Sequence, residues 1–335
     1  MSGKERSRDE KNITSGKLLP DELERAVLSK VGAPRGEVLV GPRVGEDAAV
    51  IKWPDGRLMV LASDPIVGAE KGGGRLLVRV NVNDIAAKGA EPAFIIITII
   101  MPPHMGERAV AAVMSEINDE CAANNIAIVG GHTEFNDAYR RPVMCAALVG
   151  MTDRVLSAAD ISNGDAIYVS KHIGIEGMAI LASDRPDLLR GHFSESELRE
   201  IEEWMELTSV LPESRMLRDF ASFMHDPTEG GFMGGLHEIC ALAGMSAELT
   251  GGAVPLHPYT IRASEAIGFD PLRLVASGSM IAIVPKDKTA SVEERFANSP
   301  IKITKVGVMN GSALPDKNRG SHEELWGLLK RKRTA

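Results

Sequence analysis

Cysteine is scarce in this chain. Only three cysteines occur among 335 residues, Cys121, Cys145 and Cys240, and no two have the close spacing of a zinc knuckle or a redox pair. Cys121 and Cys145 stand among apolar neighbours, as buried small hydrophobic residues do. This cysteine usage argues against a disulfide scaffold and favours a reducing compartment.

Aromatic residues and long apolar runs are also few. Aromatics make up 4% of the chain, so the core must rest on aliphatic side chains. The longest apolar stretch, 94–101, contains Thr98 and is far shorter than the roughly 20 residues that a membrane-spanning helix needs. The first residues, MSGKERSRDEKN, lack the apolar centre of a signal peptide. We therefore expect a cytoplasmic protein without a membrane span.

An excess of positive charge is missing as well. The 38 lysines and arginines are outnumbered by 46 acidic residues, giving a formal net charge of -8. A general nucleic-acid binder needs a basic surface to neutralise phosphates, so we expect no nucleic-acid partner. The one dense basic run, Lys330-Arg331-Lys332-Arg333, is typical of a solvated tail.

The length and the patterning predict two domains. A chain of 335 residues exceeds one domain of roughly 150 residues, and 44% hydrophobic residues can supply two cores. Residues 1–16 are polar and aperiodic, which predicts a disordered N-terminal arm. The hydrophobic pattern restarts near Ser162-Asn163-Gly164. We expect domains at 17–155 and 156–312, followed by a helical tail at 313–335.

The first half alternates strands and helices, as an α/β sandwich does. Apolar residues at helical spacing predict the helices, and the turn sequence Pro54-Asp55-Gly56 predicts a β-hairpin. The continuous run 94–101 predicts a strand covered on both faces. The expected elements are helices 18–31, 75–88 and 104–125, and strands 48–53, 58–62, 94–101, 126–129 and 143–150.

The second half has a similar mixture. Strands are expected at 166–170, 280–284 and 301–308, with helices at 174–182, 194–211 and 230–243 and another between the last two strands. Gly244 would end the helix 230–243.

Four acidic groups in the first half stand where strands or helices meet Gly-rich turns. They are Glu46-Asp47, Ser63-Asp64, Asn81-Val82-Asn83-Asp84 and Gly130-Gly131-His132-Thr133-Glu134. Each alone is typical of solvated loop acids, but together they suit Mg²⁺, which takes hard oxygen ligands and neutralises phosphates in phosphoryl transfer.

No P-loop pattern occurs in the chain. The run Gly72-Gly73-Gly74 opens a helix, so its N–H groups could meet an anion or could simply form a flexible turn. Lys17, beside Gly16 at the edge of the N-terminal arm, is a second candidate to contact a nucleotide.

These motifs together resemble the aminoimidazole ribonucleotide synthetase superfamily. Gly45-Glu46-Asp47-Ala48-Ala49-Val50 is similar to its GDDAAV signature, and the groups around Asp64, Asp84 and Glu134 follow in the same order. In the second half, Gly164-Asp165-Ala166 and the run His225-Asp226-Pro227-Thr228-Glu229-Gly230-Gly231 resemble the HypE-like hydrogenase-maturation branch. The resemblance covers residues 16–310.

The resemblance implies an α+β, two-domain PurM-like fold. It implies an N-terminal α/β sandwich whose sheet forms a homodimer, a C-terminal α+β domain, and ATP with Mg²⁺ bound near the dimer interface. Members of the superfamily activate a carbonyl, amide or phosphate oxygen by phosphorylation. The implied substrate is an unidentified small molecule or a protein-borne group.

Site residues follow from the same resemblance. Asp47, Asp64 and Asp84 are the expected Mg²⁺ ligands, with Asn81 and Asn83 beside them to orient ligands or phosphates. We expect the glycine run 72–74 and Lys17 to help enclose the nucleotide.

His132 stands where several members carry an acid. Since a neutral imidazole is a poor Mg²⁺ ligand, Glu134 could supply the oxygen while His132 contacts a phosphate or acts as a general acid or base. A hydrogen-bonded loop histidine is the alternative. We expect His132 and Glu134 closest to the transferred phosphate.

Asp226 and Thr228 precede a helix that either could cap, and the resemblance places their loop near the substrate.

Two departures leave two functions open. The hydrogenase-maturation branch carries its substrate on a C-terminal cysteine, and no cysteine follows Cys240 here. The reactive N-terminal cysteine or selenocysteine of the selenophosphate branch is absent too. The chain is therefore expected to be an ATP- and Mg²⁺-dependent enzyme or, alternatively, a nucleotide-binding maturation or regulatory partner without turnover of its own.

Overall fold

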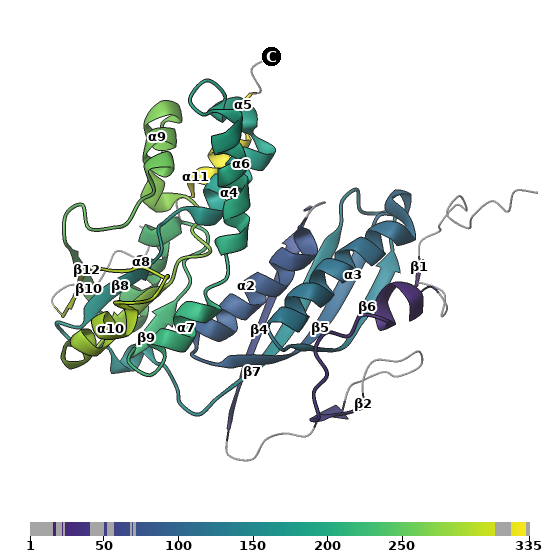
Figure 1. Ribbon diagram of the computed structural model, residues 1–335, viewed down its shortest axis with the longest axis horizontal. Coiled ribbons are helices and arrows are strands. Elements are labelled where there is room, and N and C mark those ends of the chain that lie inside the picture. Colours follow the sequence, from purple (N-terminus) through teal and green to yellow (C-terminus); the bar gives the residue numbers. More distant parts are fainter. Residues whose placement is uncertain are drawn as a thin grey trace, which may run out of the picture. The chain divides into compact units, whose positions relative to one another are not determined.

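The computed structural model describes residues 16–17, 22, 24–40, 50–51, 57–67, 69, 72–311 and 323–332 (Figure 1). The chain divides into two compact units. Unit 1 runs to Ile85 and includes Ala90–Asp153, and unit 2 comprises Ala86–Gly89 and the residues from Arg154 onward. Almost all of the expected arm 1–16 lies outside the described residues. Among the described helices none has the length and apolarity of a membrane span.

Unit 1 is built on a five-stranded sheet with the order β1-β6-β5-β7-β4. Only β5 and β6 are parallel, and the other neighbours are antiparallel. The strands are β1 (Gly16–Lys17), β4 (Leu58–Val67), β5 (Glu91–Met101), β6 (Ala127–Phe135) and β7 (Val143–Thr152). This order puts β4 at one edge of the sheet. A separate ladder joins β2 (Val38–Val40) to β3 (Val50–Ile51).

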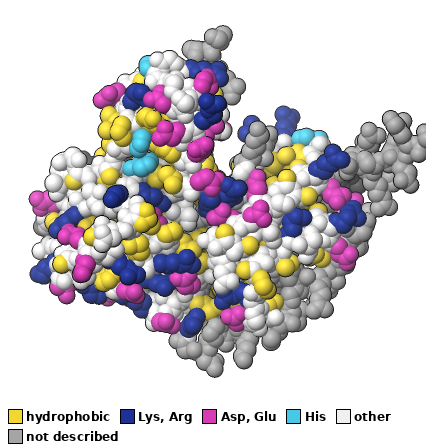
Figure 2. All heavy atoms as spheres, in the orientation of Figure 1, with side chains coloured by type: hydrophobic (Ala, Val, Ile, Leu, Met, Phe, Trp, Pro, Cys, Tyr) yellow, Lys and Arg dark blue, Asp and Glu magenta, His cyan; other side chains and the backbone are white. Residues whose placement is uncertain are grey.

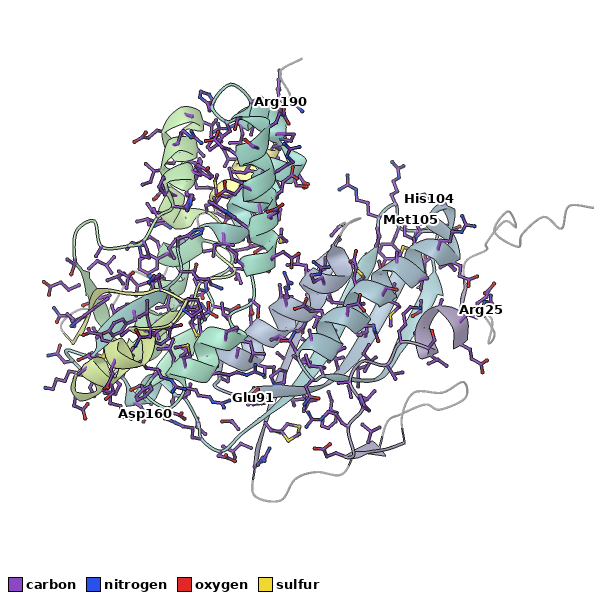
Figure 3. All side chains as sticks on the ribbon, viewed as in Figure 1. Arg25, Glu91, His104, Met105, Asp160 and Arg190 are labelled. Carbon is purple, nitrogen blue, oxygen red and sulfur yellow. The ribbon has the colours of Figure 1, made fainter. Side chains whose placement is uncertain are left out.

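Two long helices, α2 (Gly73–Ala87) and α3 (Gly106–Ala123), lie across one face of this sheet (Figure 1). The helical spacing in α3 is confirmed, because its inner residues are all buried: Val110, Val113, Met114, Ile117 and Cys121. The expected helix 18–31 is described as a five-residue π-helix, Glu24–Leu28. Arg25 of this turn, labelled in Figure 3, pairs with Glu107 of α3 at 3.3 Å.

Among the described residues of unit 1, no helix lies on the other face of the sheet. Alternate residues of β4 and β5 on this face are exposed, including Leu61 (65%), Val67 (69%) and Ile96 (48%). The expectation that the strand at 94–101 is covered on both faces is therefore wrong, since both helices pack on the same side. We call this surface the open face.

The expected β-hairpin is also wrong. Val50–Ile51 pairs with β2, whereas Leu58–Val67 pairs along its whole length with β7. A turn sequence favours a local reversal, but the ten-residue ladder with β7 is a longer partner than a short hairpin could provide. The turn sequence itself lies outside the described residues.

Strand β6 continues well past its predicted end at the two glycines. It runs to Phe135, with a register shift where Gly130 meets Ile96. A Cβ on Gly131 would lie 2.0 Å from the carbonyl oxygen of Ile97, so glycine allows β5 and β6 to stay paired at this point. His132 and Glu134 therefore belong to a strand.

Unit 2 contains a second five-stranded sheet, antiparallel throughout, with the order β10-β12-β8-β11-β9. The strands are β8 (Ala166–Ser170), β9 (Phe223–His225), β10 (Ser246–Leu249), β11 (Ile281–Val284) and β12 (Ile303–Asn310). The helices are α4 (Ile175–Asp184), α5 (Pro186–Leu189), α6 (Glu195–Glu203), α7 (Leu211–Leu217), α8 (Gly231–Ala243), α9 (Pro258–Ile267), α10 (Thr289–Phe296) and α11 (Glu324–Leu329). The expected strands and the helix between the last two are confirmed.

The expected helix 194–211 is broken into two. Ser194 and Glu197 form a capping box at the start of α6, and the helix passes into a short 3-10 turn at Trp204–Leu207. A new helix, α7, begins at Leu211 with Pro212 in its first turn, where a missing N–H costs nothing.

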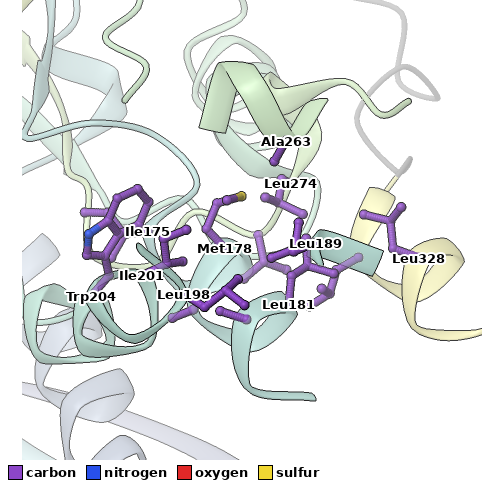
Figure 4. Close-up of a cluster of buried hydrophobic side chains, with 14 of the residues drawn as sticks. Ile175, Met178, Leu181, Leu189, Leu198, Ile201, Trp204, Ala263, Leu274 and Leu328 are labelled. Carbon is purple, nitrogen blue, oxygen red and sulfur yellow. The ribbon is translucent and has the colours of Figure 1, made fainter. Parts of the chain in front are cut away.

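One apolar cluster of unit 2 packs α4, α6, α9 and α11 together (Figure 4). Leu325 and Leu328 of α11 are both 1% exposed within it. The guanidinium of Arg185 donates to the carbonyls of Leu328 and Leu329, and Arg331 donates to the carbonyl of Gly268. The C-terminal segment is thus docked onto unit 2, and Arg331 is not part of a free solvated tail.

Acidic and basic side chains are interspersed over the face seen in Figure 2.

Candidate functional site

The backbone of Asp64 is held by a side chain from α2. The carboxamide oxygen of Asn81 accepts the Asp64 N–H at 2.9 Å, and its nitrogen donates to the Asp64 carbonyl at 3.3 Å. The same nitrogen donates to the carbonyl of Leu77 at 2.8 Å. Asn81 is completely buried, so these bonds replace its contact with water.

Asp64 itself lies on the helix-covered face of β4. Ile66, two residues further along the strand, lies near Gly73 of α2. Side chains at positions i and i+2 of a strand share a face, so Asp64 lies on the same face as Ile66. The Asp64 carboxylate is half-buried, and no ion pair or hydrogen bond joins it to another side chain in the described part of the chain. A half-buried carboxylate of this kind has the donor chemistry that Mg²⁺ takes.

Two further predicted residues lie on α2. Asp84 follows Asn81 by three residues, so the two are neighbours on the helix surface, and Asp84 is half-buried. Asn83 is 1% exposed. The structure therefore groups Asp64, Asn81 and Asp84 on the α2 side of the sheet.

The third predicted Mg²⁺ ligand, Asp47, lies outside the described residues. Among the residues that are described, no three His, Cys, Asp or Glu side chains gather closely enough to hold a metal ion. The carboxylates of Asp64 and Asp84 are oxygen donors of the type that Mg²⁺ takes, and Asp47 stays a prediction.

His132 and Glu134 form a pair on β6. The Nε2 atom of His132 lies 3.1 Å from a Glu134 carboxylate oxygen, and the other oxygen accepts from Asn136 at 3.2 Å. The His132 and Glu134 side chains are 40% and 27% exposed. Glu134 therefore orients the imidazole through this contact.

Lys17 is placed next to this pair by backbone pairing. In the β1–β6 ladder Lys17 stands opposite Glu134, and Gly16 stands opposite Phe135. This pairing could not be predicted from local sequence patterns, because the two strands are more than a hundred residues apart. The sequence analysis also did not identify Asn136, which donates a hydrogen bond to Glu134.

The two groups do not share one site within unit 1. A single row crosses the sheet from Asp64 on β4, and it consists of Asp64, Ala146, Ile97 and Gly131. His132 is the next residue after this row and points to the open face, while Asp64 points to the helices. Three strand spacings of about 4.8 Å separate β4 from β6. The predicted phosphate-side pair and the predicted metal ligands are therefore apart.

The glycine run at the start of α2 already has an anionic partner. The N–H groups of Gly72 and Gly74 donate to the two carboxylate oxygens of Glu116 in α3, at 3.2 and 3.0 Å. A Cβ on Gly74 would lie 2.5 Å from the carbonyl oxygen of Val113, and one on Gly73 would lie 2.9 Å from Met144. The run therefore allows α2 to approach α3 and the sheet closely, and a phosphate there would have to displace Glu116.

The loop before α8 in unit 2 holds the other two predicted residues. Asp226 is buried and Thr228 is exposed. Helix α8 starts after Gly230, whose φ of 79° is left-handed, and neither the Asp226 nor the Thr228 side chain caps it. The capping role that the sequence offered for Asp226 or Thr228 is therefore not seen, although the Thr228 carbonyl accepts the N–H of Ala276 at 3.3 Å.

Glu323 serves this helix start in their place. Its carboxylate accepts the N–H groups of Gly230 at 2.5 Å, Val275 at 3.2 Å and Leu325 at 2.7 Å. Burial raises the pKa of Glu323, and burial raises that of Glu176 nearby. Sequence reasoning missed both residues, because nothing local links Glu323 to a loop 93 positions earlier.

Comparison with known proteins places these features in context. The N-terminal domain model of AIR synthase related proteins matches residues 45–152, and the C-terminal domain model matches residues 162–314. A putative hydrogenase expression/formation protein of Methanocaldococcus jannaschii is 25% identical over 292 residues, covering 85% of each chain. The carbamoyl dehydratase HypE of Cupriavidus necator is 28% identical over 251 residues, covering 72% of this chain and 69% of that one.

Solved structures show the same architecture. HypE of E. coli superposes with a TM-score of 0.72 at 20% identity, covering 88% of this chain and 92% of that one. Thiamine-monophosphate kinase from Stenotrophomonas maltophilia gives 0.69 at 18%, covering 88% and 93%. A HypE in complex with ATP gives 0.63 at 21%, covering 81% of each. At these identities the likeness establishes the fold, and the expected α+β, two-domain PurM-like fold is confirmed.

Proposed function

Because the chain belongs to the AIR synthase related proteins through both of their domains, we propose that it is an ATP- and Mg²⁺-dependent enzyme that phosphorylates an oxygen atom of its substrate. The relatives support this reaction class. One is named a carbamoyl dehydratase, another a thiamine-monophosphate kinase, and one HypE structure holds ATP.

The observation that carries the proposal is the arrangement around Asp64. Its half-buried carboxylate has no described protein partner, its backbone is fixed by Asn81, and Asp84 lies on the same side of the sheet. Mg²⁺ bound there would neutralise charge on the ATP phosphates during transfer. Asp64 and Asp84 would hold the ion together with Asp47.

The transfer breaks the bond between the β–γ bridging oxygen and the γ-phosphorus and forms one to a carbonyl, amide or phosphate oxygen, releasing ADP. With a carbonyl or amide oxygen, that oxygen leaves later as part of inorganic phosphate. The proposed substrate is a small molecule or a group on another protein. Asp226 and Thr228 of unit 2 are proposed to contact it.

The His132–Glu134 pair has a separate proposed role. An imidazole oriented by a carboxylate can hold or pass a proton, as general acid–base catalysis requires. Lys17, whose backbone lies opposite Glu134 in the ladder, is proposed to contact the nucleotide. We do not assign the glycines 72–74 to the phosphates, because Glu116 occupies two of their N–H groups.

The open face is proposed to bind a second copy of the chain. Leu61, Val67 and Ile96 expose large apolar side chains on one sheet surface, and such surfaces mark association sites. A dimer formed there would cover the His132–Glu134 pair. Ile96→Glu is expected to convert a dimer to a monomer in light scattering, whereas Leu242→Glu, at an exposed site in unit 2, is expected to leave it dimeric.

The test of function is ATP turnover by the purified protein with Mg²⁺, alone and with small amides, carboxylates and thiamine phosphate. We expect turnover with one of these and none with its Asp64→Asn variant. Where the substrate oxygen is a carbonyl or amide labelled with ¹⁸O, the label is expected in the released phosphate. Tight ATP binding without turnover under any condition would instead support a nucleotide-binding maturation or regulatory partner.

A further inference from the structure

We propose that Asn81 is a positioning residue that sets the Asp64 carboxylate by acting as a substitute strand partner for Asp64. This inference rests on the proposed function of Asp64. In this role Asn81 binds the protein backbone, whereas the sequence analysis expected it to orient a ligand or a phosphate.

The need for such a partner comes from the sheet order. Among the described strands, β4 lies at the edge of the sheet and pairs with β7 on one side only. The outward N–H and C=O groups of an edge strand have no ladder partner. Asp64 is a residue whose outward groups are met by a side chain: Asn81 accepts from its N–H and donates to its carbonyl.

A carboxamide is the side chain suited to this task. It carries one acceptor oxygen and two N–H donors in a plane, like a peptide group. Asn81 uses the oxygen on the Asp64 N–H and the nitrogen on the carbonyls of Asp64 and Leu77. Asn81 is 0% exposed, so the side chain has no water to exchange with and no freedom to turn toward a ligand.

The hydrogen bonds between Asn81 and the Asp64 backbone hold two candidate metal ligands, Asp64 and Asp84, in fixed relative positions. Asp84 lies on the same helix as Asn81, three residues further on, and Asp64 lies on β4, which Asn81 binds. Fixing the strand to the helix at this residue sets the separation between the two carboxylates. Groups that hold metal ligands in place affect metal affinity by roughly 10–100-fold when removed.

The test compares Asn81→Ser with the wild type. A serine hydroxyl can still donate to the Leu77 carbonyl one turn earlier, but it is too short to reach Asp64. Asn118→Ala is the matched control, because Asn118 of α3 accepts the backbone N–H of Gly32 at 3.1 Å in the same unit and does not contact Asp64. Asn81→Asp is a second variant. It keeps an oxygen that accepts the Asp64 N–H, but it places its second oxygen against the carbonyl oxygens of Asp64 and Leu77.

Two measurements are made on each protein. Hydrogen exchange reports protection of the Asp64 amide, which we expect to fall about tenfold or more in Asn81→Ser and to stay unchanged in Asn118→Ala. The thermal shift with ATP is then titrated with Mg²⁺. The Mg²⁺ concentration for half of the shift is expected to rise about tenfold in both Asn81 variants, with ATP affinity in EDTA unchanged.

A purely structural role for Asn81 would lower the melting temperature without moving the Mg²⁺ midpoint, and that result would overturn the proposal. Unchanged protection of the Asp64 amide would overturn it as well. The variant Asp64→Asn distinguishes failure of the proposed Mg²⁺ role of Asp64 from failure of the positioning role of Asn81. If that variant keeps the wild-type Mg²⁺ response, the proposed function has failed at this site, and the positioning role falls with it. If Asp64→Asn loses the response and Asn81→Ser keeps it, only the positioning role is wrong.

Discussion

Replacing Glu116 by glutamine tests how the glycine run at the start of α2 is used. The Glu116 carboxylate accepts the N–H groups of Gly72 and Gly74 at 3.2 and 3.0 Å. Glutamine keeps one acceptor and turns an N–H₂ group toward the other donor. One hydrogen bond to a charged acceptor contributes about 1.5–3 kcal/mol, and a negative charge at a helix start about 0.3–1 kcal/mol. Because Glu116 is half-exposed, we expect a loss of about 1.5 kcal/mol.

The assays are denaturant unfolding and ATP titration. A loss of about 1.5 kcal/mol corresponds to a fall in melting temperature of about 3–6 °C for a unit of this size. ATP affinity is expected to stay within about twofold of the wild type. Glu107→Gln is the control, since its ion pair with the exposed Arg25 is worth at most about 1 kcal/mol. Unchanged stability of Glu116→Gln together with tenfold tighter ATP binding would contradict this prediction. It would indicate that the glycine N–H groups bind the ATP phosphates.

Two further predictions concern unit 2. Burial, with His257 nearby, lowers the pKa of His172 to about 4, so the unfolded chain takes up this proton first as the pH falls below about 6.5. The free energy of unfolding should therefore be highest above that pH and fall by about 2 kcal/mol by pH 5, as measured by urea unfolding across pH. His172→Phe should remove this loss, whereas His192→Ala, at an exposed position, should retain it. Lys171→Met should cost about 3–5 kcal/mol, because it leaves the Glu213 carboxylate, 1% exposed and 2.7 Å from the lysine, buried without its cation. The double variant with Glu213→Leu should recover most of that loss in the same assay, and a failure to recover would mean that the pair is not what Lys171 contributes.

The parts of the fold that the sequence predicted well are those governed by local periodicity. In α3 every third or fourth residue is apolar and buried, and no other element competes for that pattern. The helix at α8 begins and ends at glycines with left-handed φ, which the sequence also indicates. Such features depend only on neighbouring residues.

The errors come from long-range pairing. A turn sequence precedes β4, yet the partner of this strand, β7, lies about eighty residues away. Likewise His132 was expected on a loop, because two glycines are usual at strand ends, whereas Gly131 allows close contact with β5 and the strand continues. Side-chain periodicity does not encode which strands meet.

The candidate site shows the same division. The acids Asp64 and Asp84 could be found from the motif order, but their separation from His132 could not, because it depends on which face of the sheet each side chain leaves. Asn81 was noted as a residue near the site, and only the structure shows that it binds the backbone of Asp64. Asp47 stays a prediction.

The most direct test of the central claim is calorimetric titration of ATP into the wild-type protein and into Asp64→Asn, each with Mg²⁺ and with EDTA. We expect Mg²⁺ to strengthen ATP binding by the wild type, and we expect Asp64→Asn to lose this gain while still binding ATP weakly in EDTA. Equal strengthening by Mg²⁺ in both proteins would contradict the assignment of the metal to Asp64.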